Sequence, residues 1–454
     1  MVERREDTPS VPSSGEAVET KLRRIARKAR SDPKFQFTSL FHLMNEELLR
    51  GCFKRLRGRA AAGIDGVTKD AYAEHLEENL TALVERLHRL AYVPQSVRRV
   101  YIPKPGSVKG RPLGITCLED KLVESGLVRI LEQIYEQDFI DDSFGFRPDR
   151  GCHDALRALN VSLERGGTEW VVEADIKGFF DNVDHDWLMR FLAHRVADRR
   201  VLRMVKRFLK AGVCEDGQVY VSDEGVPQGG SISPILANVY LHYALDLWFE
   251  GRFRKGCAGR ARLIRYADDF VVCFSKQADA ERFRSELVVR LAEFGLEVEP
   301  SKTKVLAFGR SAQGRARRQG RSKPETFDFL GFTHFCGRTR DGKRFHVKRV
   351  TAKKKFKAKL AAIKEWLKHN RATLRTRELW EQICVKIRGH FAYYGVTGNF
   401  WSLDRFLAEV KQLLFQWLNR RGGRRHMTWE QFTRMQRSFP FPRLHTRVNL
   451  YHFA

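Results

Sequence analysis

The stretch "IRYADDFVVCF", residues 264–274, places two adjacent carboxylates, Asp268 and Asp269, inside a strand-like apolar run. Burying an ionised carboxylate without a partner is costly, so such a pair needs a cation, a hydrogen-bond network or protonation. Asp is also common in hairpin turns, but this stretch has no Gly or Asn to make a tight turn comfortable. We therefore expect the two acids to serve chemistry rather than the turn alone.

A third acid, Asp175, ends another apolar run, "WVVEAD" (170–175). By itself, Asp175 is interpreted most simply as a helix cap. Taken together, three converging carboxylates fit a divalent-ion site, because Mg²⁺ takes hard oxygen ligands and is completed by substrate phosphates. Two such ions, about 3.5–4 Å apart, can clamp the attacking and leaving oxygens of a phosphoryl displacement. The residues alone predict a metal-dependent nucleotidyl-transfer or phosphodiester enzyme.

The net charge of +28 is concentrated in the last third of the 454-residue chain. Residues 301–454 hold 36 Lys and Arg against 9 Asp and Glu, whereas residues 1–300 hold 47 against 46. A solubility surface needs no such asymmetry, so nucleic acid is the expected partner and an anionic membrane surface a distant second. The chain has no apolar run long enough to span a bilayer, no signal-peptide core and no metal-ligand spacing among its eight cysteines. We therefore expect an intracellular protein with reduced thiols.

The order of patterns along the chain predicts an α+β protein. Residues 1–20 are polar and are expected to form a disordered tail, and helical patterning begins at residue 21. Strand-like and helical segments then alternate as far as residue 308, which suits a sheet backed by helices on one face. Residues 309–325 are rich in Gly, Ser and Arg and are expected to form a mobile basic loop. Amphipathic helices near 352–369, 377–394 and 403–418 predict a basic helical C-terminal domain.

Several motifs together resemble the reverse transcriptases encoded by bacterial group II introns. They are "YADD", "EADIKGFFDNVDH" and "VPQGGSISPILANVYL", joined in the family's order by "SVRRVYIPKPGSVKGRPLGI", "SFGFRPDRGCHDAL", "FGLEVEPSKTKV" and "FDFLGF". The resemblance covers about residues 35–450 and implies a right-hand polymerase with an antiparallel palm sheet. Residues 21–95 would extend the fingers, residues 96–335 would form fingers and palm, and residues 336–454 would form an α-helical thumb, or maturase domain.

The resemblance also implies roles for the acids. Asp175 and Asp268 are similar to the two main metal ligands, and Asp269 to the third acid of the palm. The backbone carbonyl of Ile176 would complete the site. These groups would hold two Mg²⁺ ions, with Mn²⁺ as an alternative.

A second group of residues resembles the nucleotide site. Phe180 is similar to the steric gate that leaves no room for a 2′-hydroxyl, although with Phe179 adjacent it could equally be a core residue. Lys104 and Arg111 would meet the triphosphate, or else the template. Gln228 would lie near the sugar of the incoming nucleotide, and Lys302 near the phosphates or the primer end.

The thumb is expected to grip RNA through basic side chains and base stacking. The residues expected to bind RNA are Arg315, Arg317, Arg318, Lys353, Lys354, Lys355, Arg388, Tyr393, Arg424 and Arg425. An aromatic stripe at helical spacing is more often core, and we assign Phe391 and Trp417 to the core.

The resemblance implies an RNA-directed DNA polymerase that also binds its intron RNA as a maturase and assists splicing and retrohoming. Its partners would be the intron RNA, an RNA template with a DNA primer, dNTPs and target DNA, in the bacterial cytoplasm, with a homodimer left open. The family often carries a DNA-binding segment and an H-N-H endonuclease after the thumb, whereas this sequence ends at Ala454, so we expect the compact type. Two alternatives stay open: a domesticated enzyme in antiviral defence or CRISPR-linked acquisition, and a splicing factor with a vestigial polymerase.

Overall fold

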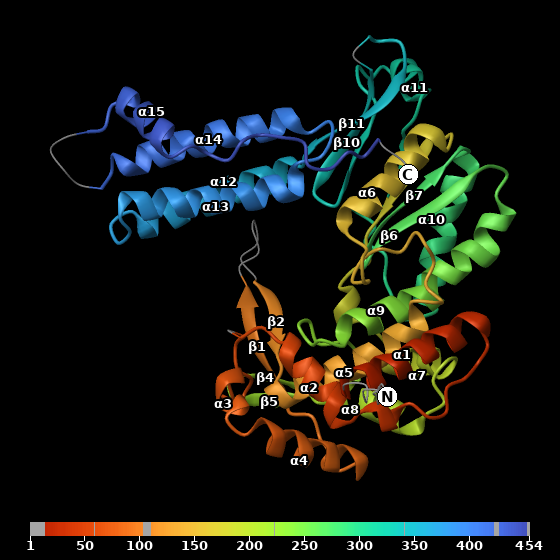
Figure 1. The fold of residues 1–454 in the computed structure, drawn as a ribbon. Helices are drawn as coiled ribbons and strands as arrows, with labels where there is room; N and C mark the ends of the chain where they lie inside the picture. The colour runs from red at the N-terminus through yellow and green to blue at the C-terminus, as the bar shows by residue number, and fades with distance from the viewer. Residues whose placement is uncertain are drawn as a thin grey trace, which may run out of the picture. The chain divides into compact units, whose positions relative to one another are not determined.

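The computed structural model describes residues 14–58, 60–102, 110–221, 223–339, 341–421 and 426–451 (Figure 1). The chain divides into two compact units that do not follow chain order. Unit 1 comprises residues 1–149, 176–252 and 287–298, and unit 2 comprises residues 150–175, 253–286 and 299–454. The expected boundary between residues 335 and 336 falls inside strand β10 (Phe332–Arg338), whose residues on both sides of that boundary pair with the next strand in sequence.

Unit 1 combines helices with a small sheet. Its helices are α1 (Ser14–Ser31), α2 (Glu46–Arg55), α3 (Lys69–Ala73), α4 (Leu76–His88), α5 (Leu118–Tyr135), α7 (His185–Ala193), α8 (Arg199–Leu209) and α9 (Ser233–Leu241). The sheet has the order β2-β1-β4-β5, from β1 (Val97–Ile102), β2 (Arg111–Ile115), β4 (Val213–Glu215) and β5 (Gln218–Tyr220). Short 3-10 turns lie at Phe41–Leu43 and Phe179–Asp181, and π-helical turns at His242–Asp246 and Phe249–Phe253 follow α9; a further 3-10 turn, Arg254–Gly256, belongs to unit 2.

Local sequence explains several of these elements. Asn45 begins α2 by accepting a hydrogen bond from the backbone of Leu48, and the carboxylate of Asp184 begins α7 in the same way at 2.7 Å from the nitrogen of Trp187. Helix α5 buries apolar residues that repeat at helical spacing, among them Leu127, Ile130, Leu131 and Ile134. Helix α1 begins at Ser14, so the prediction of a disordered tail is wrong for residues 14–20, and residues 1–13 lie outside the described chain.

The central sheet of unit 2 is antiparallel, with the order β6-β7-β3-β8. It contains β3 (Trp170–Ala174), β6 (Ala261–Tyr266), β7 (Asp269–Phe274) and β8 (Lys304–Ala307), and its middle strands bury Val171, Val172, Val271 and Val272. Helix α6 (Cys152–Arg165) packs against β6, and the helix Gln277–Ala292 (α10) sets Phe283 against Phe274 of β7, with ring centroids 5.6 Å apart. The alternation of apolar runs and helical periods is thus confirmed as a helix-backed antiparallel sheet.

A second, three-stranded antiparallel sheet of order β11-β10-β9 follows, from β9 (Thr326–Phe329), β10 and β11 (Phe345–Thr351). Before it, residues 312–318 form helix α11 (Ala312–Arg318), which buries Ala312 and Ala316. The expected mobile loop at 309–325 is therefore wrong over this helix. Its side chains are held by residues far away in sequence, as described below.

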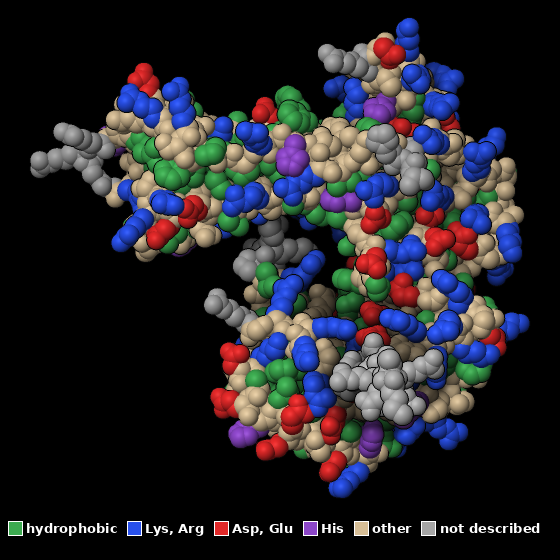
Figure 2. Space-filling model, in the orientation of Figure 1, with side chains coloured by type: hydrophobic (Ala, Val, Ile, Leu, Met, Phe, Trp, Pro, Cys, Tyr) green, Lys and Arg blue, Asp and Glu red, His purple; other side chains and the backbone are tan. Residues whose placement is uncertain are grey.

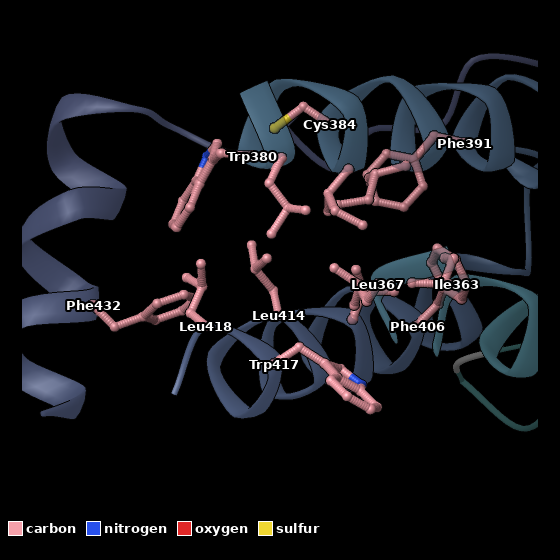
Figure 3. Close-up of a cluster of buried hydrophobic side chains, with 14 of the residues drawn as sticks. Ile363, Leu367, Trp380, Cys384, Phe391, Phe406, Leu414, Trp417, Leu418 and Phe432 are labelled. Atoms are coloured by element: carbon pink, nitrogen blue, oxygen red, sulfur yellow. The ribbon is translucent and has the colours of Figure 1, made fainter. Parts of the chain in front are cut away.

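Four helices build the C-terminal part of unit 2: α12 (Lys353–Asn370), α13 (Thr376–Tyr394), α14 (Phe400–Leu418) and α15 (Trp429–Ser438). Figure 3 shows their shared core, in which Phe391, Leu414 and Trp417 are buried as their helical spacing predicted. Helix α15 was not predicted from sequence, although Thr428 and Gln431 form a capping box at its start. Across the described residues, no helix is long and apolar enough to cross a membrane.

Candidate active site

The stretch 264–274 folds as a hairpin whose two turn residues are Ala267 and Asp268, closed by the pairing of Tyr266 with Asp269. Ala267 takes a φ of +56°, in the left-handed region that glycine usually occupies. A non-glycine residue in such a conformation costs on the order of 1–3 kcal/mol, and the cost is tolerated where the surroundings hold the turn. The expectation that this turn lacks a residue suited to it is confirmed. The unfavourable backbone conformation is that of Ala267, which immediately precedes the two acids.

Arg265 helps to hold this turn. Its side chain is fully buried, and its Nη1 donates a hydrogen bond to the carbonyl oxygen of Ala267 at 3.0 Å. A buried guanidinium that binds the carbonyl of the strained residue restricts the turn directly. Arg265 was not predicted as a functional residue, although an Arg within the apolar strand "ARLIRY" was a visible signal.

Asp175 lies at the same end of the sheet as the turn. Ala174, the last residue of β3, pairs with Phe270 of β7, so the chain reaches Asp175 beside the start of β7. Its carboxylate accepts a hydrogen bond from Nζ of Lys302 at 2.5 Å, which raises the pKa of Lys302. The structure thus places all three acids named from sequence at the same end of the sheet, and it pairs Asp175 with Lys302.

The three carboxylates act on one another electrostatically. The pKa of Asp269 is raised to about 7, first by desolvation and then by the negative charge of Asp268, with a smaller contribution from Asp175. A hydrogen bond from the Leu330 backbone and the charge of Lys355 oppose this shift. Asp269 keeps contact with solvent, so surrounding atoms rather than complete burial cause its desolvation. Mutually repelling carboxylates of this kind attract a cation.

The donor set fits a divalent cation in its chemistry, because carboxylate oxygens are the ligands that Mg²⁺ and related ions prefer. Within the described residues, however, no three His, Cys, Asp or Glu side chains are gathered closely enough to hold a metal ion. Asp175 is engaged with Lys302 instead. Ile176, whose carbonyl was expected to join the site, has a buried side chain and forms a β-bridge with Val298.

Unit 1 contains a cavity of about 360 Å³, and only one of the two adjacent phenylalanines, Phe179 and Phe180, lines it. Phe180 lines the cavity together with Gln228, whereas Phe179 is only 2% exposed and packs against Tyr240. The Phe180 carbonyl accepts a hydrogen bond from the nitrogen of Val226 at 2.7 Å, which fixes the strand-to-helix segment against the loop that carries Gln228. The structure therefore assigns Phe179 to the core and Phe180 to the cavity wall.

The loop that carries Gln228 is held by close backbone packing. The Gln228 carbonyl accepts a hydrogen bond from the nitrogen of Gly114 at 2.5 Å, and a Cβ at Gly229 would clash with the Gly114 carbonyl oxygen. Beneath the loop, the buried carboxylate of Glu124 accepts a hydrogen bond from the nitrogen of Ser231 at 2.7 Å, and burial raises its pKa to about 8. Glu124 was not singled out from sequence, where it sits among ordinary helix residues.

Arg111 and Lys104 were also predicted to lie at the nucleotide site. Arg111 is exposed as the first residue of β2 and pairs with Ile102 across the hairpin. Lys104 lies outside the described residues.

The residues expected to bind RNA fall into three groups. Arg317, Arg318, Lys353, Lys354, Lys355 and Arg388 are exposed, and Arg424 and Arg425 lie outside the described residues. Arg315 instead forms an ion pair with Glu169 at 2.9 Å and lies over the ring of Trp170. Tyr393 packs against Phe332, and its hydroxyl donates a hydrogen bond to the Leu330 carbonyl at 2.9 Å. These contacts favour structural roles for Arg315 and Tyr393.

An antiparallel sheet with three acids at one end, followed by a basic helical region, is the arrangement of a nucleic-acid polymerase palm and thumb. The family model for reverse transcriptase (RNA-dependent DNA polymerase) matches residues 102–334. The chain therefore belongs to the reverse transcriptase family. Members of this family generally use divalent metal ions.

Named relatives refine this assignment. The chain is 40% identical over 222 residues to the group II intron-encoded protein LtrA of Lactococcus lactis, a match covering 49% of this chain and 37% of that protein. It is 33% identical over 297 residues to protein YkfC of Escherichia coli, covering 58% of this chain and 78% of that protein. Nuclear intron maturase 2 of Arabidopsis thaliana matches at 28% over 179 residues, covering 31% of this chain and 24% of that protein. The chain spans little more than a third of LtrA, and the resemblance to group II intron proteins is confirmed.

Proposed function

We propose that the protein is an RNA-directed DNA polymerase of the group II intron type, which extends a DNA primer on an RNA template with dNTPs. The observation that carries this proposal is the strained turn that sets Asp268 and Asp269 at the same sheet end as Asp175. One end of the sheet combines an unfavourable backbone conformation with three repelling carboxylates. Both features lower stability, which indicates that this end is organised for chemistry.

We further propose that Asp175, Asp268 and Asp269, which are not close enough to hold an ion in the free protein, draw together around two Mg²⁺ ions when Lys302 leaves Asp175, with Mn²⁺ as a substitute and the Ile176 carbonyl as an additional oxygen. The ions would stabilise the charge that develops on the phosphates during nucleotidyl transfer. The exposed ammonium of Lys302 neutralises Asp175 in the free protein and would move to the triphosphate or primer end when these bind. Arg111 and Lys104 would contact the triphosphate, since guanidinium and ammonium groups suit phosphate oxygens.

Phe180 would select the sugar. Its ring lines the cavity that Gln228 shares, and a 2′-hydroxyl would meet the ring where a deoxyribose leaves space. Gln228, fixed through its carbonyl to Gly114, would contact the same sugar.

A primer-extension assay tests the polymerase directly. Wild-type protein with Mg²⁺, dNTPs and a primed RNA template is expected to give extended DNA, and Asp268→Asn is expected to give none while binding the same RNA with nearly unchanged affinity. Absence of product from wild type, with the RNA tightly bound, would refute the polymerase and favour an RNA-binding splicing factor.

The maturase role rests on the relatives and on the excess of cationic side chains in residues 301–454, where 36 Lys and Arg face 9 Asp and Glu. We propose that the protein binds its own intron RNA in the bacterial cytoplasm, assists splicing and then reaches target DNA. A self-splicing assay with the RNA that flanks the gene is expected to show faster splicing at low Mg²⁺ when the protein is added. No acceleration would refute this role and leave a domesticated polymerase as the interpretation.

A further inference from the structure

A basic cleft of about 760 Å³ lies between helix α11 and the β10–β11 hairpin of unit 2. Its walls carry five cationic side chains and the amide of Gln313, above a floor that includes Cys336, Gly337 and Phe345; the cations are Arg310, Arg317, Arg338, Lys343 and Arg344. Among the described residues that line the cleft there is no carboxylate. Figure 2 shows Lys and Arg side chains gathered over this part of the molecule, at the upper right.

These five cations differ from their neighbours in the same segment. Arg315 is paired with Glu169 at 2.9 Å and Arg321 with Glu325 at 3.0 Å, so both are neutralised within the protein. In the described part of the chain, none of the five cleft cations forms an ion pair. Arg310 and Arg338 donate hydrogen bonds to backbone carbonyls, at 3.4 Å and 3.0 Å, which orient the guanidinium groups without cancelling their charge.

The acid nearest in sequence, Asp341 at the tip of the hairpin, forms no ion pair with the five cleft cations among the described residues. It accepts hydrogen bonds from the Thr339 hydroxyl and from the backbone nitrogen of Lys343, and these bonds lower its pKa, with a smaller contribution from the charge of Arg344. It thus shapes the turn that presents Lys343 and Arg344. Like charges held around a concave surface repel one another, and a bound polyanion relieves that repulsion.

The cleft is separate from the acids. It adjoins Gly309, just beyond the end of β8, where Ala307 pairs with Trp170 at the first residue of β3. Asp175 follows the last residue of the same strand. At about 3.3 Å per residue, the length of β3 sets the two ends roughly 15 Å apart. The cleft therefore cannot serve the phosphates of a nucleotide held by the acids.

We propose that this cleft binds the phosphodiester backbone of an RNA strand and anchors it away from the site of synthesis. The proposal rests on the proposed function, for which RNA is the template and the intron partner. Arginine guanidiniums contact phosphates through paired hydrogen bonds, and cations spread over the cleft suit successive phosphates of one strand. Contacts of this kind carry little sequence preference and weaken steeply with salt.

The test uses the full-length protein with the double charge reversal R317E/R344E, which changes both walls of the cleft. The matched control is K276E/R284E, an equal change of charge at two exposed residues that lie outside the cleft. The probe is a labelled primed RNA template, with Kd measured over a series of salt concentrations. Thermal melting of each variant checks its folding, and R317K/R344K keeps the positive charge.

We expect R317E/R344E to weaken RNA binding by about tenfold or more and to reduce the slope of log Kd against log salt by about 2, one unit for each phosphate that the variant no longer neutralises. The control is expected to change Kd less than about threefold, and R317K/R344K to retain most of the affinity. Equal reductions of affinity in R317E/R344E and the control would overturn the proposal, as would unchanged affinity in both.

A small anion could share the cleft chemistry, so inorganic pyrophosphate is added as a competitor. If pyrophosphate binds wild type but not R317E/R344E while RNA affinity is unchanged, the cleft is a small-anion site and the RNA proposal is wrong. Primer extension by wild type on the same template separates the two claims. Its failure would refute the polymerase, whereas the comparison of RNA affinities would still decide the cleft.

Discussion

The two ends of the central sheet of unit 2 carry opposite charges, and we propose different functions for them. At one end Asp175, Asp268 and Asp269 repel one another across a turn with a strained residue. At the other end Arg317, Arg344 and their neighbours surround a cleft with no internal ion pairs among the described residues. The acid end depends on exact placement of a few atoms, so single changes there should be severe. At the basic end, many weak contacts to a polyanion add up, so each substitution there should lower the RNA affinity only in part.

The largest effect is expected from Asp175→Asn. Loss of this carboxylate would remove a proposed metal ligand and the partner of Lys302, and extension should fall by more than about 1,000-fold, as is usual when one member of a catalytic set is removed. Single-turnover primer extension measures it. The control is Asp186→Asn, an exposed acid in the first turn of α7, which should leave extension close to wild type. Comparable effects in both variants would mean that general charge, not this site, was being measured.

Arg265→Lys tests whether the turn must be held. Lysine keeps the charge but cannot reproduce the guanidinium geometry at the Ala267 carbonyl, so the two acids should shift and kcat should fall by roughly 10–100-fold. A purely structural role would lower the melting temperature without changing kcat in the folded fraction. An unchanged kcat would show that Arg265 does not position the turn.

Phe180→Ala and Phe179→Ala form a matched pair in unit 1. Phe180→Ala opens the cavity wall and should reduce discrimination against ribonucleotides by about tenfold or more, at little cost in stability. Phe179→Ala empties a core position and should lower the free energy of unfolding by about 3–5 kcal/mol while discrimination is kept. Competition between dNTP and rNTP incorporation, with urea unfolding alongside, measures both. If Phe180→Ala instead lowered the free energy of unfolding and Phe179→Ala reduced the discrimination against ribonucleotides, Phe180 would be the core residue.

The smallest effect is a pH dependence of stability without divalent ions. The folded protein holds the proton of Asp269 up to about pH 7, whereas an unfolded Asp releases it near pH 4. The folded state therefore binds more protons in this window, and the free energy of unfolding should fall as the pH rises from about 4 to about 7. Asp269→Asn should flatten this slope in chelator-containing urea titrations. A slope identical to wild type would mean that other raised acids, such as Glu173 and Glu124, account for it.

Sequence patterns predicted the acid end well because its signals are local. Apolar runs predicted β3, β7 and β8, and acids at their ends were visible without a fold. Helical spacing likewise predicted α12, α13 and α14 and their buried residues. These elements are defined by residues within a few positions of one another, which is the range over which periodicity carries information.

The basic end was predicted less well because long-range contacts define it. Residues 309–325 look like a loop, with only small apolar side chains in α11, yet Arg315 is tied to Glu169 and Trp170 more than a hundred residues earlier. The same contacts decide which arginines remain available for a ligand. Likewise, only packing against Tyr240 separates Phe179 from Phe180, since adjacent identical residues carry no distinguishing signal.

The contrast between the two ends is tested most directly by measuring primer-extension rate and RNA affinity together on Asp268→Asn and R317E/R344E. The account predicts that Asp268→Asn abolishes extension while its Kd for primed RNA stays within about threefold of wild type, and that R317E/R344E weakens RNA affinity by at least about tenfold. If Asp268→Asn weakens affinity as severely as R317E/R344E, or if R317E/R344E binds RNA like wild type, the division of the sheet into a catalytic end and an anchoring end is contradicted.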